Sequence, residues 1–258
     1  MTNATKPLST IDVNLSTHRP LFSRFSVVAL VIGMVITFFV SQLFGIYLAG
    51  KCLLPAADTL AVSDILFLGS TDGTIVSLSI IVSCVILILF SVLLIRLKGG
   101  NVQRYLALNA FSLTIAMAMI GVLLLFMIGS QALTYWLDET PLDFVDPLFQ
   151  TVSSVWLLIV AMVIIAPIYE ELIFRGLLWS AITEQFAGQR GAVIASIVTS
   201  IIFATIHLQY GIYEVSTIVV LALIFCYARI KSGSLLLAIL LHILNNGVAM
   251  CQYLLQVA

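Results

Sequence analysis

The sequence predicts an all-α, polytopic transmembrane helical bundle of about seven spans (six to eight). Of its 258 residues, 62% are hydrophobic and 9% are Asp, Glu, Lys or Arg, whereas ordinary soluble domains are about 45–50% apolar and about 25% charged. Mean hydropathy is +1.19. Several runs of about 20 residues carry almost no charge, which is the length that crosses the hydrocarbon core as a helix.

The apolar runs give the elements in chain order. A polar tail, residues 1–24, comes first, and the run after it is too long for a cleaved signal peptide. The linkers are short, so any reaction must use residues of the helices, and we expect the active site inside the bundle. Residues 169–183 are apolar enough to continue the fourth span or to re-enter the membrane. Spans are predicted near 25–49, 74–95, 106–130, 148–168, 191–208, 215–229 and 234–255.

Charges between the spans segregate by sign. By the positive-inside rule this predicts an integral multi-pass protein in the lipid bilayer with a cytoplasmic N-terminal tail. The net charge of −1 is uninformative about nucleic acid, but the chain has no basic stripe and no Lys/Arg run, so we expect no nucleic-acid partner. The scattered Cys52, Cys84, Cys226 and Cys251 form no metal-binding pair. The basic connections hold Lys6, Arg19, Arg24, Arg96, Lys98, Arg104, Arg229 and Lys231, and the acidic ones hold Asp58, Asp64, Asp72, Asp138, Glu139, Asp143 and Asp146.

Polar residues inside the apolar runs are the candidate site, because an ionised side chain at the bilayer centre costs about 2.5–3.5 kcal/mol. They form three groups within the C-terminal 90 residues: Glu170, Glu171 and Arg175; then Phe203 and His207; then His242 and Asn246.

The spacing within each group predicts which side chains share a helical face. Glu171 and Arg175, four apart, can pair, while Glu170 points about 100° away and stays free. Pro167 is expected to kink the helix and free carbonyls to line a wet cavity. A carboxylate, two imidazoles and the Asn246 carboxamide can activate water and stabilise an oxyanion.

Each group also has a structural interpretation. An ion pair such as Glu171–Arg175 is common near a membrane surface, and Glu170 alone could be solvated there. Single histidines are more often hydrogen-bonded packing residues, and Asn246 could bond across helices. Only the coincidence of the three groups favours a catalytic site.

The motifs E-E-x-x-x-R, F-x-x-x-H and H-x-x-x-N, over about residues 165–250, resemble the CAAX protease and bacteriocin-processing family. These intramembrane endopeptidases are also described as ABI-family or lysostaphin-resistance-like proteins. The resemblance divides the chain into the tail 1–24, transmembrane helices without a recognised motif at 25–147 and a catalytic transmembrane region at 148–258. The motifs of site-2-type, aspartyl and rhomboid intramembrane proteases (H-E-x-x-H, G-x-G-D and G-x-S-G) are absent.

The resemblance implies a membrane-associated protein or peptide substrate and a role for each residue. Glu170 is implied to be the general base for water, His207 to position water or a metal, and His242 and Asn246 to stabilise the oxyanion or bind metal. Glu171, Arg175 and Phe203 are implied to support them. A divalent metal such as zinc, held by Glu170, His207 and His242, and a metal-free glutamate mechanism both stay open.

Two other functions stay open: a non-proteolytic membrane partner or bacteriocin-immunity protein, and a small transporter that uses Glu170 as a proton site. One difficulty concerns depth. The predicted spans place Glu170 near the cytoplasmic end of its helix, but His242 about 12 Å and His207 about 24 Å along theirs. Either the connection 184–190 dips into the membrane, the helices tilt, or the boundaries differ.

Overall fold

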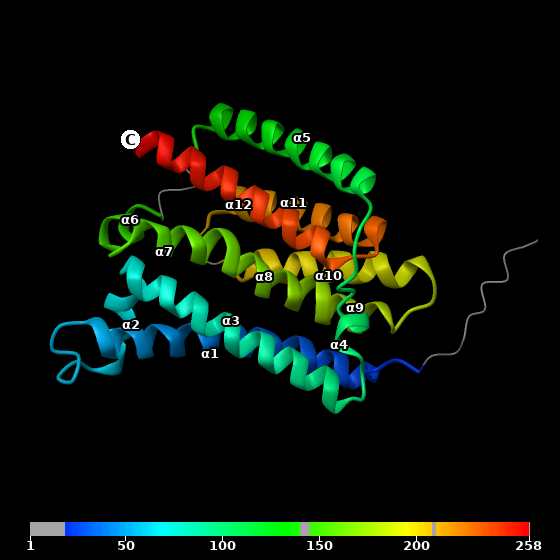
Figure 1. Ribbon diagram of the computed structural model, residues 1–258, viewed down its shortest axis with the longest axis horizontal. Coiled ribbons are helices and arrows are strands. Elements are labelled where there is room, and N and C mark those ends of the chain that lie inside the picture. Colours follow the sequence, from blue (N-terminus) through cyan, green and yellow to red (C-terminus); the bar gives the residue numbers. More distant parts are fainter. Residues whose placement is uncertain (1–18, 140–144, 208–209, 258) are drawn as a thin grey trace, which may run out of the picture.

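The computed structural model describes residues 19–139, 145–207 and 210–257. All regular secondary structure in these parts is helical, and the long helices run side by side along the long axis of the molecule (Figure 1). Most of the predicted tail and Asp143 lie outside the described residues. The helices are α1 (Arg24–Leu53), α2 (Val62–Ser70), α3 (Gly73–Leu97), α4 (Val102–Tyr105), α5 (Leu113–Leu137), α6 (Asp146–Thr151), α7 (Val155–Ile159), η2 (Val160–Ile165), α8 (Ala166–Glu171), η3 (Leu172–Leu178), α9 (Trp179–Thr183), α10 (Gln189–Thr205), α11 (Ile212–Ser232) and α12 (Leu235–Val257).

Six helices in the described parts are long and apolar enough to cross a membrane, which confirms the predicted fold class. The predicted span at 191–208 corresponds to α10, which has only 17 residues and is shorter than a full span. The six are Arg24–Leu53, Gly73–Leu97, Leu113–Leu137, Val155–Thr183, Ile212–Ser232 and Leu235–Gln256.

The boundary predicted at residue 168 is wrong. Helical structure continues without a break from Val155 to Thr183, through α7, η2, α8, η3 and α9. Pro167 does not end the helix because it lies in the first turn of α8, directly after the π-helical η2. Residues 169–183 therefore continue the fourth span.

The third span begins seven residues later than predicted, at Leu113. The preceding segment is held by the neighbouring connection instead of by helical hydrogen bonds. Leu235 N donates to Ala107 O at 2.8 Å, and Asn109 Nδ2 donates to Gly233 O at 3.0 Å. The helix then runs on to Leu137 and is followed by Asp138 in the left-handed conformation.

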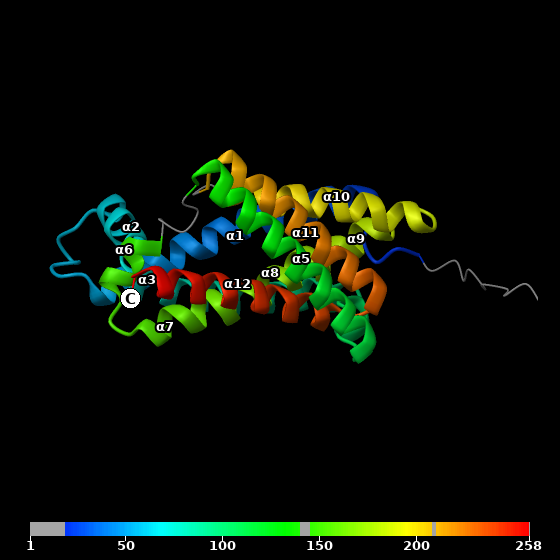
Figure 2. The same cartoon turned by 90° about the horizontal axis from the view of Figure 1, so that it is seen from above.

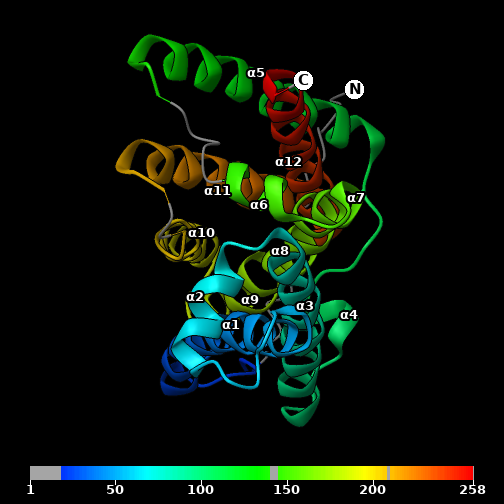
Figure 3. The same ribbon diagram turned by 90° about the vertical axis from the view of Figure 1, so that its left-hand side faces the viewer.

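The helix Val155–Thr183 is the centre of the bundle. Of its most apolar window 61% is buried, against at most 33% for the other candidate spans. Figures 2 and 3 show α1 and α3 on one side of it, α10, α11 and α12 around the remainder, and α5 at the edge. At the contact of α1 with α3, a Cβ on Gly45 would lie 2.7 Å from Ser79 Cα, so only glycine allows this approach.

The two ends of the bundle differ in charge. The connections from α1 to α3 and from α5 to α7 lie at one end with the C-terminus of α12, and their described charges are acidic apart from Lys51 (Figure 1). The start of α1, α4 and the connections from α9 to α10 and from α11 to α12 lie at the other end, with most of the basic residues. We call these the acidic end and the basic end.

Candidate active site

Glu170 and Glu171 lie in the middle of a helix whose hydrogen-bond pattern changes twice. The π-helical η2 precedes α8, which carries both glutamates, and the π-helical η3 follows it. Turns of this kind are rare and occur frequently at functional sites. Glu170 is 15 residues from Val155 and 13 from Thr183. The expectation that Glu170 lies near an end of its span is therefore wrong. Because Glu170 lies in the middle of its helix, the expected difference in depth between it and the two histidines no longer arises.

The carbonyl of Met162 explains why Asn246 is needed beside this helix. Its α-helical donor, the N–H of Ala166, bonds instead to Ala161 O. The next residue, Pro167, has no N–H to offer. Asn246 Nδ2, from α12, donates to Met162 O at 3.0 Å, while Asn245 Nδ2 donates to Asn246 Oδ1 at 3.2 Å. The side chain of α12 thus supplies the hydrogen bond that the π-helical turn lacks.

Glu171 is a buried anchor for two other motif residues. Its Oε1 accepts from Arg175 Nη1 at 2.7 Å, which confirms the predicted pair, and lies 2.9 Å from His242 Nδ1. Glu171 and Arg175 are fully buried. The guanidinium of Arg175 also lies over the ring of Phe203 at 4.4 Å. Such a buried cation needs both the carboxylate and the aromatic face.

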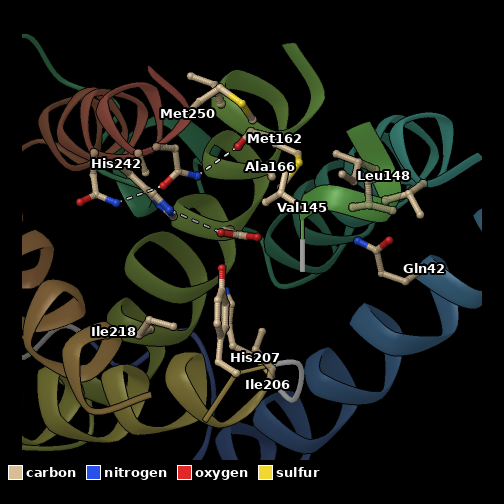
Figure 4. A pocket seen from close by; sticks show the side chains of 18 of the residues that line it. Gln42, Val145, Leu148, Met162, Ala166, Ile206, His207, Ile218, His242 and Met250 are labelled. Carbon is tan, nitrogen blue, oxygen red and sulfur yellow. Dashed lines mark hydrogen bonds and ion pairs between the residues drawn. The ribbon is translucent and has the colours of Figure 1, made fainter. Parts of the chain in front are cut away.

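Glu170 faces the other ring nitrogen of His242, Nε2. Its Oε2 lies 3.7 Å from His242 Nε2, so the imidazole stands between the two carboxylates. Figure 4 shows the side chain of His242 on the cavity. Glu170 lines the central cavity, whereas Glu171 does not. Because Nδ1 donates to the carboxylate of Glu171, Nε2 is the nitrogen that faces Glu170 and the cavity. The predicted division, with Glu171 paired and Glu170 free of Arg175, is what the geometry shows.

His207 lies on another side of the same cavity from His242 (Figure 4). Its Nδ1 lies 2.7 Å from Phe203 O. A carbonyl only accepts, so Nδ1 carries the hydrogen and Nε2 has a lone pair free for water or a metal. Tyr210 stacks on the His207 ring at 6.1 Å. Burial first, then the charges of Glu170 and Glu214, raise the pKa of Tyr210, so its phenol stays neutral.

Phe203 is more than a core residue. Its ring contacts those of Phe174, His207 and His242 at centroid distances of 5.2, 4.7 and 5.9 Å. Together with its contact to Arg175, this makes Phe203 the common packing partner of all three motifs.

The reasoning from sequence missed a polar contact from the N-terminal helices. Gln42 on α1 donates from Nε2 to the hydroxyl of Tyr169 at 3.0 Å, and Ser79 on α3 lies 3.3 Å from Gln42 Oε1. Tyr169 directly precedes Glu170, and both Tyr169 and Gln42 line the cavity. Gln42 is the single amide of the predicted span 25–49 and could have been noticed as an intramembrane polar residue.

These groups surround a cavity of about 630 Å³ between α1, α3, the central helix, α10, α11 and α12, which residues of α2 and α6 also line. Glu170, Phe203, His207, His242 and Asn246 all line it, so the structure brings the free residues of the three motifs to one hollow. Glu171 and Arg175 lie behind it. The buried group of Glu170, Glu171 and His242 is consistent with an active site.

The expected metal set is not assembled. The described residues contain no group of three or more His, Cys, Asp or Glu side chains placed to hold a metal ion. Glu170 and His242 are close, but no ion pair among the described residues joins His207 to either glutamate. Glu170, His207 and His242 therefore do not converge as the ligands of a tetrahedral zinc ion do.

Comparisons with known proteins agree with the motifs. Residues 152–248 match the family described as Type II CAAX prenyl endopeptidase Rce1-like. An uncharacterized 24.3 kDa protein of Escherichia coli is 31% identical over 94 residues, which cover 36% of this chain and 42% of that protein. The chain thus spans about two-fifths of the curated relative that it matches, and no solved structure matches it. The similarity to the Rce1-like type II CAAX prenyl endopeptidase family is thus found over residues 152–248, which hold all three motifs.

Proposed function

We propose that the protein is an intramembrane endopeptidase that hydrolyses a peptide bond of a membrane-associated protein or peptide. The observation that carries the proposal is the approach of Glu170 Oε2 to His242 Nε2, 3.7 Å apart, on a cavity that His207 also lines. A carboxylate and imidazoles around one hollow inside the bundle are the groups that peptide hydrolysis needs. The family that matches residues 152–248 is one of endopeptidases, which supports the same reaction.

Glu170 is the general base of this proposal. Its carboxylate takes a proton from water, and the water oxygen bonds to the carbonyl carbon of the substrate. The carbon–nitrogen bond then breaks, and the proton moves from Glu170 to the departing amine. His242, fixed through Nδ1 by Glu171, faces Glu170 with Nε2 and assists this transfer.

The oxyanion and the water are held by the remaining groups. His207 offers Nε2 as an acceptor for the attacking water, because its Nδ1 is occupied by Phe203 O. Asn246 has two amide hydrogens and uses one on Met162 O, so the second remains for the oxyanion. Glu171, Arg175 and Phe203 position these groups.

The test is peptide hydrolysis by the purified, full-length protein in lipid nanodiscs. A library of quenched fluorogenic peptides with apolar cores is incubated with wild type, Glu170→Gln and Glu139→Gln. We expect Glu170→Gln to lose at least about a hundredfold in rate, within the range of general-base catalysis. Glu139, exposed at the acidic end, is a matched control that keeps its rate. Equal rates for Glu170→Gln and wild type would exclude the proposed base and favour a non-proteolytic membrane partner.

A zinc-dependent version of the same activity uses Glu170, His207 and His242 as ligands. It requires His207 to move toward the other two residues, because the three do not form a donor group in the structure. Metal analysis of the purified protein, with and without a chelator, tests this version. Stoichiometric metal whose loss parallels loss of cleavage would establish it, and full activity in metal-free protein would exclude it.

A further inference from the structure

The described residues that line the cavity reach one end of the bundle only. From Glu170 and His242 the cavity reaches the exposed Ser70, Thr71 and Pro147 at the acidic end. No described residue that lines it belongs to the connections at the basic end, 98–112, 184–188 and 233–234. The exposed residues of the described lining therefore indicate that a substrate reaches the cavity from the acidic end, opposite to the start of α1.

Between the mouth and Glu170 the lining is mostly apolar. This part is suited to hydrophobic side chains near the bond to be cut, and its volume is within the range of about 300–1,000 Å³ typical of ligand sites. The apolar residues include Phe38, Phe39, Val76, Ile80, Leu148 and Met250.

The mouth itself is acidic. Asp72 follows the lining residue Thr71, Asp146 precedes Pro147, and Glu214, in the first turn of α11, is four residues after Tyr210 in the sequence. Asp146 accepts a hydrogen bond from Tyr253, another lining residue, at 2.8 Å. Lys51 is the one basic residue at this end in the described parts, and it is paired with Asp58 at 3.3 Å. Nothing basic in the described structure neutralises the three carboxylates at the mouth.

We propose that substrate enters from the acidic end as an apolar peptide segment whose cationic flank stays at the mouth, near Asp72, Asp146 and Glu214. The proposal rests on the proposed endopeptidase function and names its substrate class. The buried Glu170 at the inner end of the cavity receives the apolar part, and complementary charge orients the flank.

Charge recognition is tested with two fluorescent peptides that share an apolar core and carry either three lysines or three glutamates at one end. Binding is measured by fluorescence polarisation on Glu170→Gln in nanodiscs, so the result does not depend on cleavage. The rim variant D72N/D146N/E214Q keeps the shapes, and Asn retains the capping role of Asp72. The control variant D64N/D138N/E139Q removes the same charge from residues that do not line the cavity.

We expect the lysine peptide to bind about tenfold more tightly than the glutamate peptide at low salt, and the rim variant to remove this preference. The control variant should keep the preference for the lysine peptide within about twofold of the Glu170→Gln value, and high salt should reduce this preference. Equal binding of both peptides, or equal loss in the two variants, would overturn the cationic flank. Selective binding without cleavage of the same peptides by wild type would support the inference and count against the proposed function.

Direction of access is tested with thiol labelling. In a C52S/C251S background, which lacks the two exposed cysteines, Thr71→Cys and Arg190→Cys are treated with a bulky, charged maleimide. Thr71 lines the mouth, and Arg190 is exposed at the basic end. Labelling at residue 71 should abolish binding of the lysine peptide, and labelling at residue 190 should leave it unchanged. The reverse pattern would place the entrance at the other end.

Discussion

Asn246 Nδ2 donates to the main-chain oxygen of Met162 at 3.0 Å and so joins α12 to the π-helical turn that precedes Glu170. The bond replaces two missing main-chain donors, one diverted to Ala161 O and one absent at Pro167. It therefore fixes the helix that carries the proposed base against the helix that carries His242.

Asn246→Leu should destabilise the protein by about 1–3 kcal/mol, because it leaves the part-buried carbonyl of Met162 without a donor. Thermal unfolding in detergent measures the loss, and the cleavage rate should fall with it. Asn245→Ala is the control, since Asn245 donates only to the side chain of Asn246 and should cost less. An equal loss of stability in the two variants would contradict the claim that the Met162 carbonyl depends on the hydrogen bond from Asn246.

Pro167→Ala should partly rescue Asn246→Leu. Alanine restores an N–H at the position from which a π-helical turn can supply Met162 O. A double-mutant cycle on unfolding free energies measures the coupling, and we expect the double variant to be less destabilised than the sum of the single variants. Strict additivity would show that the two residues do not serve the same carbonyl.

Removal of Glu171 alone should destabilise the protein more than removal of both Glu171 and Arg175. Glu171→Ala leaves Arg175 as an uncompensated buried cation, which costs about 3–5 kcal/mol. The double variant Glu171→Ala/Arg175→Met removes the cation as well and should recover part of this loss. Unfolding midpoints of the three proteins provide the measurement, and a double variant less stable than Glu171→Ala would count against the argument.

Two glycines of α1 should respond differently to alanine. In Gly45→Ala the new Cβ would lie 2.7 Å from Ser79 Cα, so α1 and α3 must separate, at a cost of about 1–3 kcal/mol. Separation also moves Gln42 away from Tyr169 and should reduce cleavage. Gly33→Ala is the matched control, because nothing lies within 4 Å of its added Cβ, and helix propensity makes it neutral or stabilising. Similar losses at both positions would contradict the close approach.

The features that could be predicted from the sequence were contacts between residues close together in one helix and the residues of the three motifs. The pair of Glu171 and Arg175 follows from helical spacing alone. The fourth boundary, placed at residue 168 by hydropathy, was wrong, and the alternative that residues 169–183 continue the span is the one observed. Pro167 was expected to free a carbonyl, as seen at Met162, but the donor that α12 supplies to it depends on tertiary packing. Gln42 was missed because its contact with Tyr169 depends on how α1 packs, and hydropathy holds no information on that packing.

Hydrolysis in water enriched in ¹⁸O tests the central claim most directly, because the claim is that Glu170 activates water in a cavity inside the bundle. Reconstituted wild type should release a fragment with one ¹⁸O in its new C-terminal carboxylate, and Glu170→Gln should release almost none. Labelled product from Glu170→Gln at the wild-type rate would show that water is activated without this carboxylate, contrary to the account.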